Sequence, residues 1–406
     1  MSGILHGVKV LDLTRVIAGP LCTQHLADMG ATVIKIEKPG EGDDTRRMGP
    51  FLKNASTQSD SNDSALYLAY NRGKQSVTID FTKPAGAKLI QELARQCDVV
   101  VENFKTGSLK KYGLDYDSLR QLKPDLIYCS VTGFGQSGPK AGLPAYDFIL
   151  QGMAGVMSTC GVPDANPGGG PMRTAIPITD VVTGLNGAIA IMGALFHHSR
   201  TGEGQFIDCA MLDSAVALNG HLAIGYLMSG KVPQRVGNTN PIAAPSEVFD
   251  CSDGSIIIAA GNNRQFEACC GVLGLADLPA RAEFATNVQR VANRNALREI
   301  MQSKAAGISR ATLLADLEAA GVPCGPINNM ADVFGDPQVQ HRELAFSLPH
   351  QRGMSAPTLR SPLSFSETPV RYQSPPQLGQ HTQDVLRNLL KMEEPMIESL
   401  KREQVI

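Results

Sequence analysis

Short apolar runs alternate with helical stretches over residues 8–135, and this alternation constrains the fold more than any other feature. Strands are predicted at residues 8–14, 32–39, 98–104 and 125–135, and helices at residues 20–30, 84–97 and 116–123. Several of the strand segments are apolar on both faces, which is typical of a parallel sheet with helices on both sides. The sequence therefore predicts an α/β fold.

The pattern changes after Gly204. We expect a strand and a long helix over residues 204–230, a hairpin with its turn at Asp253–Gly254, and helices at residues 264–273 and 296–320. This stretch carries its own strands and helices, so a second, smaller domain is predicted over residues 225–325. A chain of 406 residues is long enough for two domains.

The composition argues against several classes of partner. Lys and Arg total 37 against 39 for Asp and Glu, a formal net charge of −2, so there is no broad basic field for nucleic acid or an anionic membrane. The nine cysteines are scattered without a CxxC spacing, which favours reduced thiols in a cytoplasmic protein and no metal site. The first residues do not have the pattern of a signal peptide. The first strand–helix turn lacks the GxGxxG fingerprint of a dinucleotide site.

One carboxylate stands apart. Asp180 is the only charged residue between Thr174 and Phe196, and it precedes the mostly apolar run 181–196. That run predicts a buried helix, because it is short for a bilayer span. A carboxylate in this place is either a helix N-cap or a reactive group, and the local pattern leaves both readings open.

Cations and free backbone N–H groups follow the predicted strands. In an open parallel sheet, ligands bind at the carboxyl ends of the strands. N–H groups at the start of the first helix suit an anion, and lysines or arginines at strand ends suit a polyphosphate. The residues concerned are Val16, Ile17, Ala18, Lys38, Arg46, Arg47, Arg72, Lys74, Lys105, Lys110 and Lys111.

Longer motifs identify a family. They include GVKVLDLTRVIAGPLCTQHLADMGATVIKIEKPGEGDDTR, NRGKQSVTID, DVVVENFKTGSLKKYGL, TDVVTGLNGA, GVPCGPINNMADVFGDPQVQHREL and LGQHTQDVL. Together they resemble the family III CoA-transferases, and most closely those that move CoA between dicarboxylic acids. The resemblance spans essentially the whole chain.

The resemblance implies a reaction. Asp180 matches the family's nucleophile, which forms a mixed anhydride with the donor acyl group and then an aspartyl-CoA thioester. The expected donor is succinyl-CoA and the expected acceptor is glutarate or another small carboxylic acid. CoA is a substrate, so no cofactor is implied. We expect the helix N-terminus to keep Asp180 charged at neutral pH.

It also implies binding residues. The positions that match CoA-contacting segments are Val16, Ile17, Ala18, Lys38, Arg72, Gly73, Lys74, Gln75, Asn103, Phe104, Lys105, Lys111, Tyr146 and Asp147. Pro144 stands where relatives carry a phosphate-contacting lysine, and Lys140 or Arg47 is expected to replace it. Asn240 lies in the segment that matches a mobile loop of the small domain and is expected to contact substrate. Arg46 is expected to hold the second carboxylate of a dicarboxylic acid, because a guanidinium fork fits it well.

For the architecture, the resemblance implies an interlocked homodimer. The large domain would be Rossmann-like and CoA-binding, built from residues 1–200 and 330–406. The smaller α+β domain would span residues 225–325, with linkers at 201–224 and 326–340.

Two other functions are weighed. An α-methylacyl-CoA racemase would share the fold but needs an acid–base pair, and Tyr146 stands where that family has His. Tyr is a poor base near neutral pH, since its ordinary pKa is about 10. A non-catalytic acyl-CoA-binding protein would not need an isolated carboxylate such as Asp180.

Overall fold

The computed structural model describes residues 3–53, 60–350 and 353–406. The chain forms two compact units. Unit 1 consists of Met1–Met157, Arg173–Lys231 and Gln340–Ile406, and unit 2 consists of Ser158–Met172 and Val232–Val339. Each unit has a hydrophobic core of its own.

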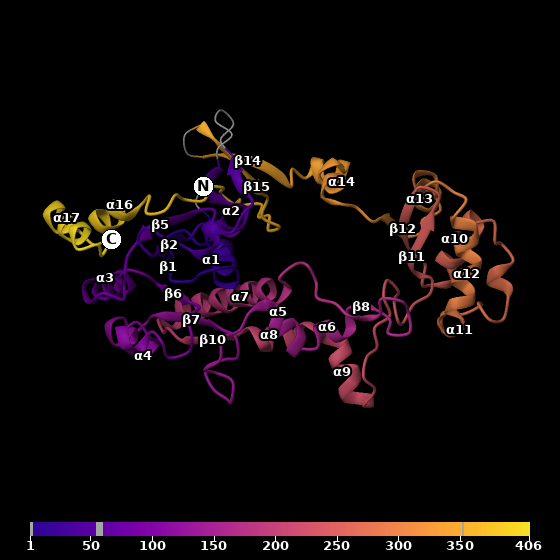
Figure 1. Ribbon diagram of the computed structural model, residues 1–406, viewed down its shortest axis with the longest axis horizontal. Helices are drawn as coiled ribbons and strands as arrows, with labels where there is room; N and C mark the ends of the chain where they lie inside the picture. The colour runs from indigo at the N-terminus through magenta and orange to yellow at the C-terminus, as the bar shows by residue number, and fades with distance from the viewer. Residues whose placement is uncertain (1–2, 54–59, 351–352) are drawn as a thin grey trace. The chain divides into compact units, whose positions relative to one another are not determined.

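A six-stranded parallel sheet forms the centre of unit 1 (Figure 1). Its strands lie in the order β10-β7-β6-β1-β2-β5, and every neighbouring pair is parallel. Their bounds are β1 Lys9–Asp12, β2 Thr32–Glu37, β5 Lys74–Thr78, β6 Val99–Glu102, β7 Ile127–Thr132 and β10 Phe206–Ala210. Most of these strand residues are buried on both faces, as a sheet covered on both sides requires.

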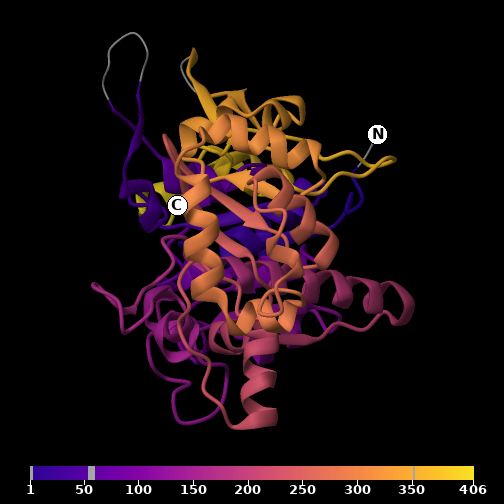
Figure 2. The same cartoon turned by 90° about the vertical axis from the view of Figure 1, so that its right-hand side faces the viewer.

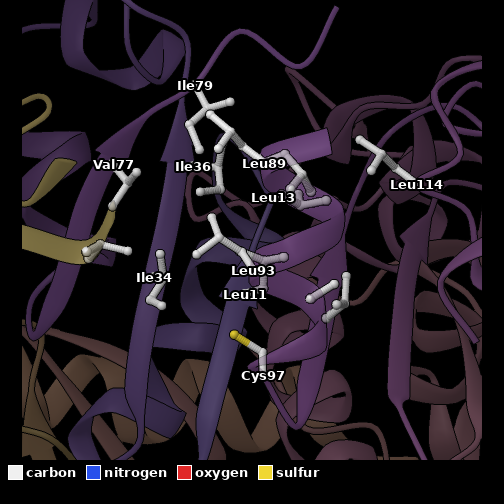
Figure 3. Close-up of a cluster of buried hydrophobic side chains, with 14 of the residues drawn as sticks. Leu11, Leu13, Ile34, Ile36, Val77, Ile79, Leu89, Leu93, Cys97 and Leu114 are labelled. Atoms are coloured by element: carbon white, nitrogen blue, oxygen red, sulfur yellow. The ribbon is translucent and has the colours of Figure 1, made fainter. Parts of the chain in front are cut away.

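One face of the sheet is covered by α3, α4, α16 and α17 (Figure 1). These helices span Pro84–Arg95, Tyr116–Leu122, Thr382–Asn388 and Glu394–Arg402. The core between them and the strands contains Leu11, Ile34, Leu89 and Leu93 (Figure 3). The last helices of the chain therefore complete the same core as the first strands.

The other face is covered by α1 (Ala18–Asp28) and α7 (Ile178–Thr201). These two helices approach closely because glycines face α1 from α7. A Cβ added to Gly184 would lie 2.7 Å from the carbonyl oxygen of Ala18, and one added to Gly187 would lie 3.2 Å from the Sγ of Cys22. A side chain at Gly184 would require a shift of the backbone, and one at Gly187 would require the thiol of Cys22 to move by a few tenths of an ångström.

Unit 1 also contains shorter elements around the sheet. Two antiparallel pairs, β3–β4 and β14–β15, lie outside the main sheet. Helix α9 carries no buried residue and projects from the rest of unit 1 (Figures 1 and 2). The bounds are η1 Asp44–Arg47, β3 Phe51–Lys53, β4 Asp60–Ser64, α2 Ala65–Tyr70, η2 Lys110–Tyr112, α5 Asp147–Met153, α8 Met211–Leu218, α9 Gly220–Ser229, β14 Ala345–Pro349 and β15 Ser355–Leu359.

Unit 2 is built on a three-stranded antiparallel sheet in the order β11-β12-β13. Helices α10, α12 and α13 pack on it through a core that includes Phe249, Phe266 and Leu297. The bounds are β8 Gly161–Val162, β9 Gly170–Pro171, β11 Ser246–Cys251, β12 Gly254–Ala259, α10 Asn263–Val272, η3 Leu278–Ala280, α11 Asn287–Ala292, α12 Arg294–Ala305, α13 Arg310–Ala319, β13 Cys324–Pro326 and α14 Met330–Gly335. Helices α6 (Val156–Thr159) and α15 (Pro337–His341) span the boundaries between the units.

All nine cysteines carry free thiols. Six of them are buried. The other three, Cys160, Cys251 and Cys324, are half-buried, and all three belong to unit 2.

The structure confirms the α/β fold and the strands and helices predicted over residues 8–135. It corrects the domain limits. Residues 201–224 are not a linker, because β10 within them pairs with β7 as the edge of the main sheet. Residues 158–172, which were assigned to the large domain, form part of unit 2.

Three helix predictions also change. The apolar helix is longer than residues 181–196, and among the described helices α7 alone is long and apolar enough to cross a membrane by length and composition. Its small residues pack on α1, while large apolar side chains such as Ile189 and Phe196 are exposed. The helix expected after β10 breaks into α8 and α9 at Gly220, whose φ is 47°. The segment 296–320 forms two helices, α12 and α13.

Gly184→Ala tests the close packing of α1 and α7. The added methyl group would meet the Ala18 carbonyl, so we expect the free energy of unfolding to fall by about 1–3 kcal/mol, the usual cost of overpacking. Gly271→Ala is the matched control, because Gly271 is also helical but a Cβ there meets nothing within 4 Å. Denaturant unfolding would measure both. A native stability for Gly184→Ala would contradict the packing argument.

Candidate active site

A cavity of about 280 Å³ opens at the carboxyl ends of β1, β6 and β7 in unit 1. The order of the strands reverses at β1, since β2 and β5 lie on one side of it and β6, β7 and β10 on the other. Ligands of open α/β sheets bind at such a switch point. The lining residues are Arg15, Val16, Ile17, Ala18, Asp44, Asn103, Phe104, Lys105, Thr106, Val131, Thr132, Gly133, Ala141, Leu143, Pro144, Ala145, Tyr146, Asp147, Asp180 and Met211.

Asp180 lies at the wall of this cavity in the first turn of α7. The N-cap of α7 is Pro177, and Asp180 is the third residue of the helix, so it is not the N-cap. Its carboxylate instead faces the backbone N–H of Ala18, the first residue of α1, which favours the charged form. The nucleophile candidate therefore lies between the N-termini of two helices.

Burial and the charge of Asp147 raise the pKa of Asp180 to about 7, although the N–H of Ala18 acts in the opposite direction. This corrects the expectation that the helix N-terminus keeps Asp180 fully charged at neutral pH. The helix dipole is typically worth about 0.3–1 kcal/mol, and removal from water outweighs it here.

Asp147 anchors the start of α7. Its Oδ1 accepts hydrogen bonds from the backbone N–H of Thr179 at 2.8 Å and from the hydroxyl of Thr179 at 2.6 Å. Its Oδ2 accepts one from Gln151 at 2.7 Å. Asp147 was predicted as a CoA contact, and its carboxylate is committed to these protein groups. Its neighbour Tyr146 is 70% exposed at the mouth of the cavity.

The two loops that follow β1 and β6 are tied together. The side chain of Asn103 accepts a hydrogen bond from the backbone N–H of Arg15 at 2.9 Å and donates one to the carbonyl oxygen of Arg15 at 2.7 Å. The guanidinium of Arg15 lies over the ring of Phe104 at 5.1 Å and 3.3 Å from Asp44. Arg15, Asp44 and Thr132 were missed by sequence reasoning, although Arg15 directly follows the first predicted strand.

The structure brings nine of the predicted residues to the cavity. They are Val16, Ile17, Ala18, Asn103, Phe104, Lys105, Tyr146, Asp147 and Asp180. The other predicted residues do not line it. Among them, Lys38 pairs with Glu41, and Lys111 lies over the ring of Tyr112. Lys140 and Arg47, the expected substitutes for the lysine missing at Pro144, do not line the cavity either.

The segment 72–75 does not line this cavity. Arg72 forms a buried ion pair with Asp28, and the ammonium of Lys74 lies 3.0 Å from Asp12 with no exposed surface. Gly73 and Gln75 line a different cavity, together with Thr32 and Val33 at the amino ends of the strands. The side chains of Arg72 and Lys74 join this segment to α1 and β1.

Arg46 is also committed to the protein. Its Nε donates to one oxygen of Glu37 at 2.7 Å and its Nη2 to the other at 2.8 Å, and the side chain is 6% exposed. The fork that was predicted to hold a second carboxylate of the substrate is therefore occupied by Glu37.

Asn240 belongs to unit 2, where its Oδ1 accepts the N–H of Ile242. The loop around it is fastened by side chains of α11 and α12. The side chain of Asn287 forms hydrogen bonds with the backbone of Ile242 and Ala244. Arg290 donates to the carbonyl oxygen of Ala244, and Arg294 donates to those of Asn240 and Ala243. The loop expected to be mobile thus has many backbone groups already satisfied.

Comparison with known proteins gives the family. The family model for CoA-transferase family III matches residues 5–382 of this chain. The chain belongs to CoA-transferase family III. A succinate–glutarate CoA-transferase of Agrobacterium fabrum is 46% identical over 391 residues, which cover 96% of each chain. The human succinyl-CoA:glutarate CoA-transferase is 40% identical over 402 residues, covering 98% of this chain and 88% of the relative.

A solved structure agrees with this assignment. A CAIB/BAIF family protein from Brucella suis matches the fold with a TM-score of 0.85 at 43% identity, covering 96% of this chain and 100% of that chain. The chain is thus a CoA-transferase. An α-methylacyl-CoA racemase and a non-catalytic acyl-CoA-binding protein are therefore no longer the preferred functions.

The carboxyl group of Asp180 should titrate near pH 7, with the protonated form below and the carboxylate above. Asp147→Asn removes the nearby negative charge but keeps an oxygen for Thr179, so the pKa of Asp180 should move to a lower value. Carbon-13 NMR of aspartate-labelled protein would follow both titrations, and Asp180→Asn identifies the signal by its loss. A midpoint that does not move in Asp147→Asn would contradict the electrostatic argument.

Proposed function

We propose that this transferase moves CoA from succinyl-CoA to a small dicarboxylate such as glutarate, with Asp180 as the covalent nucleophile. The observation that carries the proposal is the position of Asp180, a half-buried carboxylate with a raised pKa on the wall of the switch-point cavity. The names of the two relatives reported above support the choice of substrates.

The first half of the proposed reaction loads CoA onto the protein. A carboxylate oxygen of Asp180 attacks the thioester carbonyl of succinyl-CoA, the C–S bond breaks, and CoA leaves as a thiolate. The product is a mixed anhydride of succinate and Asp180. The thiolate then attacks the carbonyl carbon of Asp180, the anhydride C–O bond breaks, and succinate leaves while an aspartyl-CoA thioester remains.

The second half reverses these steps with the acceptor. A carboxylate of glutarate attacks the aspartyl thioester and releases the CoA thiolate. The thiolate then attacks the glutaryl carbonyl of the new anhydride, which forms glutaryl-CoA and restores Asp180. No water is consumed, so a cavity that excludes water protects both anhydrides from hydrolysis.

The neighbours of Asp180 have clear parts in this scheme. The N–H of Ala18 faces the carboxylate and can stabilise negative charge on the carbonyl oxygen of the aspartyl group during the reaction. The backbone at residues 16–18 and the exposed ammonium of Lys105 are the groups on this wall suited to CoA. Because Arg46 is occupied by Glu37, selection of the second carboxylate is assigned to other residues.

Asp180→Asn tests the nucleophile. The amide cannot form the anhydride, so turnover should fall by about a thousandfold or more while the protein keeps its fold and binds CoA. Hydroxylamine should trap an acylated Asp180 in the native protein incubated with succinyl-CoA and nothing in the variant.

Asp213→Asn is the matched control, because Asp213 is the third residue of α8 as Asp180 is of α7, but it is exposed. We expect native turnover for it. Near-native turnover in Asp180→Asn would exclude the covalent role, and exchange of the α-proton on the same preparation would then favour a racemase mechanism. A panel of acids offered with succinyl-CoA, read by mass spectrometry of the acyl-CoA products, would identify the acceptor.

We also propose that unit 1 is a Rossmann-like domain and that the protein is an interlocked homodimer. The strand order supports the first assignment. Large apolar side chains exposed on α7 and α9 support the second, including Ile189 at 68%, Phe196 at 64% and Met228 at 83%. Patches of this kind mark interfaces in soluble proteins.

Sedimentation at decreasing concentration tests the assembly. Interlocked chains should remain dimeric at every dilution, because dissociation then requires unfolding. Met228→Glu should lower the yield of dimer, whereas Val288→Glu should not, since Val288 is an equally exposed single residue on α11. A folded monomer of the native chain at any dilution would exclude the interlocked arrangement.

A further inference from the structure

Val16 has a backbone conformation that its side chain disfavours. It lies in the turn between β1 and α1, lines the cavity, and has a φ of 71°. In the described part of the chain, the other non-glycine residues with positive φ are Glu343, Lys391 and Gln404, so Val16 alone among them is β-branched. A β-branched residue in this region is strained and persists only when its surroundings impose it.

The surroundings that impose it are buried charges. The N–H of Val16 donates to Oδ1 of Asp43 at 3.3 Å. On the other side of the turn, the ammonium of Lys35 donates to the carbonyl oxygen of Thr14 at 2.9 Å. Lys35 and Asp43 are themselves an ion pair at 2.9 Å, and neither side chain has exposed surface. One rigid pair therefore holds the turn at two points.

Asp43 has no freedom to move away from Val16. Its Oδ1 also accepts hydrogen bonds from the N–H of Thr45 at 3.0 Å and from the hydroxyl of Thr45 at 2.8 Å, while its Oδ2 accepts one from the ammonium of Lys35. Its own N–H donates to Glu37 at 2.9 Å. Every partner of this carboxylate is a donor, so only a group with two acceptor oxygens fits.

The turn decides where the N–H of Ala18 points. Val16 is two residues before Ala18, whose N–H faces the carboxylate of Asp180 on the wall of the same cavity. If Val16 relaxed to a negative φ, the peptide groups that follow would rotate and this N–H would turn away from Asp180. The strain at Val16 is thus the local condition for the approach of this N–H to the nucleophile.

We propose that Asp43 is a positioning residue for Asp180. By accepting the N–H of Val16 it holds the strained turn, and the turn aims the N–H of Ala18 at the attacking carboxylate. This inference rests on the proposed role of Asp180 as nucleophile. It adds a residue that touches neither the substrate nor Asp180.

Asp43→Asn tests the inference. An amide that turns its NH₂ group toward Val16 and Thr45 removes their acceptor, and one that turns it toward Lys35 breaks the contact with that ammonium, so the anchor of the turn is weakened in either orientation. We expect kcat to fall about ten- to a hundredfold and the KM for succinyl-CoA to change by a smaller factor, since the backbone at residues 16–18 also faces CoA. A raised KM with native kcat would instead make Asp43 part of ground-state CoA binding and would overturn the inference.

The double variant Asp43→Asn with Val16→Gly separates positioning from general damage. Glycine adopts a positive φ without strain, so the turn no longer needs its anchor, and kcat should recover about tenfold over Asp43→Asn. Asp98→Asn is the matched control. Asp98 also accepts a backbone N–H, that of Lys9 at 2.8 Å, but it lies at the amino end of β6 and should leave kcat native. Absence of any recovery in the double variant would overturn the inference.

If Asp43→Asn does not fold, the single variant Val16→Gly still tests the inference. Release of the strain should raise Tm by a few degrees, and a lowered Tm would remove the premise. The failure of this inference is distinct from failure of the proposed function. Native kcat in Asp43→Asn together with an inactive Asp180→Asn would reject the positioning role alone, because hydroxylamine trapping at Asp180 does not depend on it.

Discussion

The approach of α7 to α1 is the contact on which the site depends. Asp180 comes from α7, and Ala18, whose N–H faces its carboxylate, comes from α1, so the distance between the two groups depends on how closely the helices pack. Gly184 lies one turn after Asp180 and faces the Ala18 carbonyl with no room for a side chain. The position of the carboxylate therefore depends on close packing at Gly184, one helical turn away, and the small residues of α7 allow this packing.

Beneath this contact, buried ion pairs set the shape of the loops at the carboxyl edge of the sheet. Lys74 with Asp12, Lys35 with Asp43 and Arg46 with Glu37 all lie within unit 1 at little or no exposure. Burial lowers the pKa of Lys74 to about 8 even though Asp12 raises it. Such pairs add little to the free energy of folding compared with apolar residues, but losing one partner costs about 3–5 kcal/mol. They define which loop conformation is compatible with the fold.

This explains what the sequence could and could not predict. The strands and helices of residues 8–135 follow from apolar periodicity, and Asp180 stands out because it is alone in an apolar run. The cations were predicted less well, since a strand end specifies that Arg46, Arg72 or Lys74 lies near the sheet but not that a carboxylate such as Glu37 or Asp28 pairs with it. Pairing depends on residues distant in sequence. The positive φ of Val16 could not be predicted either, because no local sequence pattern places a β-branched residue in the left-handed region.

The distribution of thiols has a practical consequence. Burial raises the pKa of Cys22 far above its ordinary value and that of Cys97 to about 12, so these sulfurs of unit 1 are poor nucleophiles toward alkylating reagents. The half-buried thiols Cys160, Cys251 and Cys324 all lie in unit 2. A maleimide dye applied to the native chain would consequently attach to unit 2 and leave unit 1 unlabelled. The protein thus carries natural attachment points for fluorescence on one unit alone, without engineering a cysteine into the unit that holds Asp180.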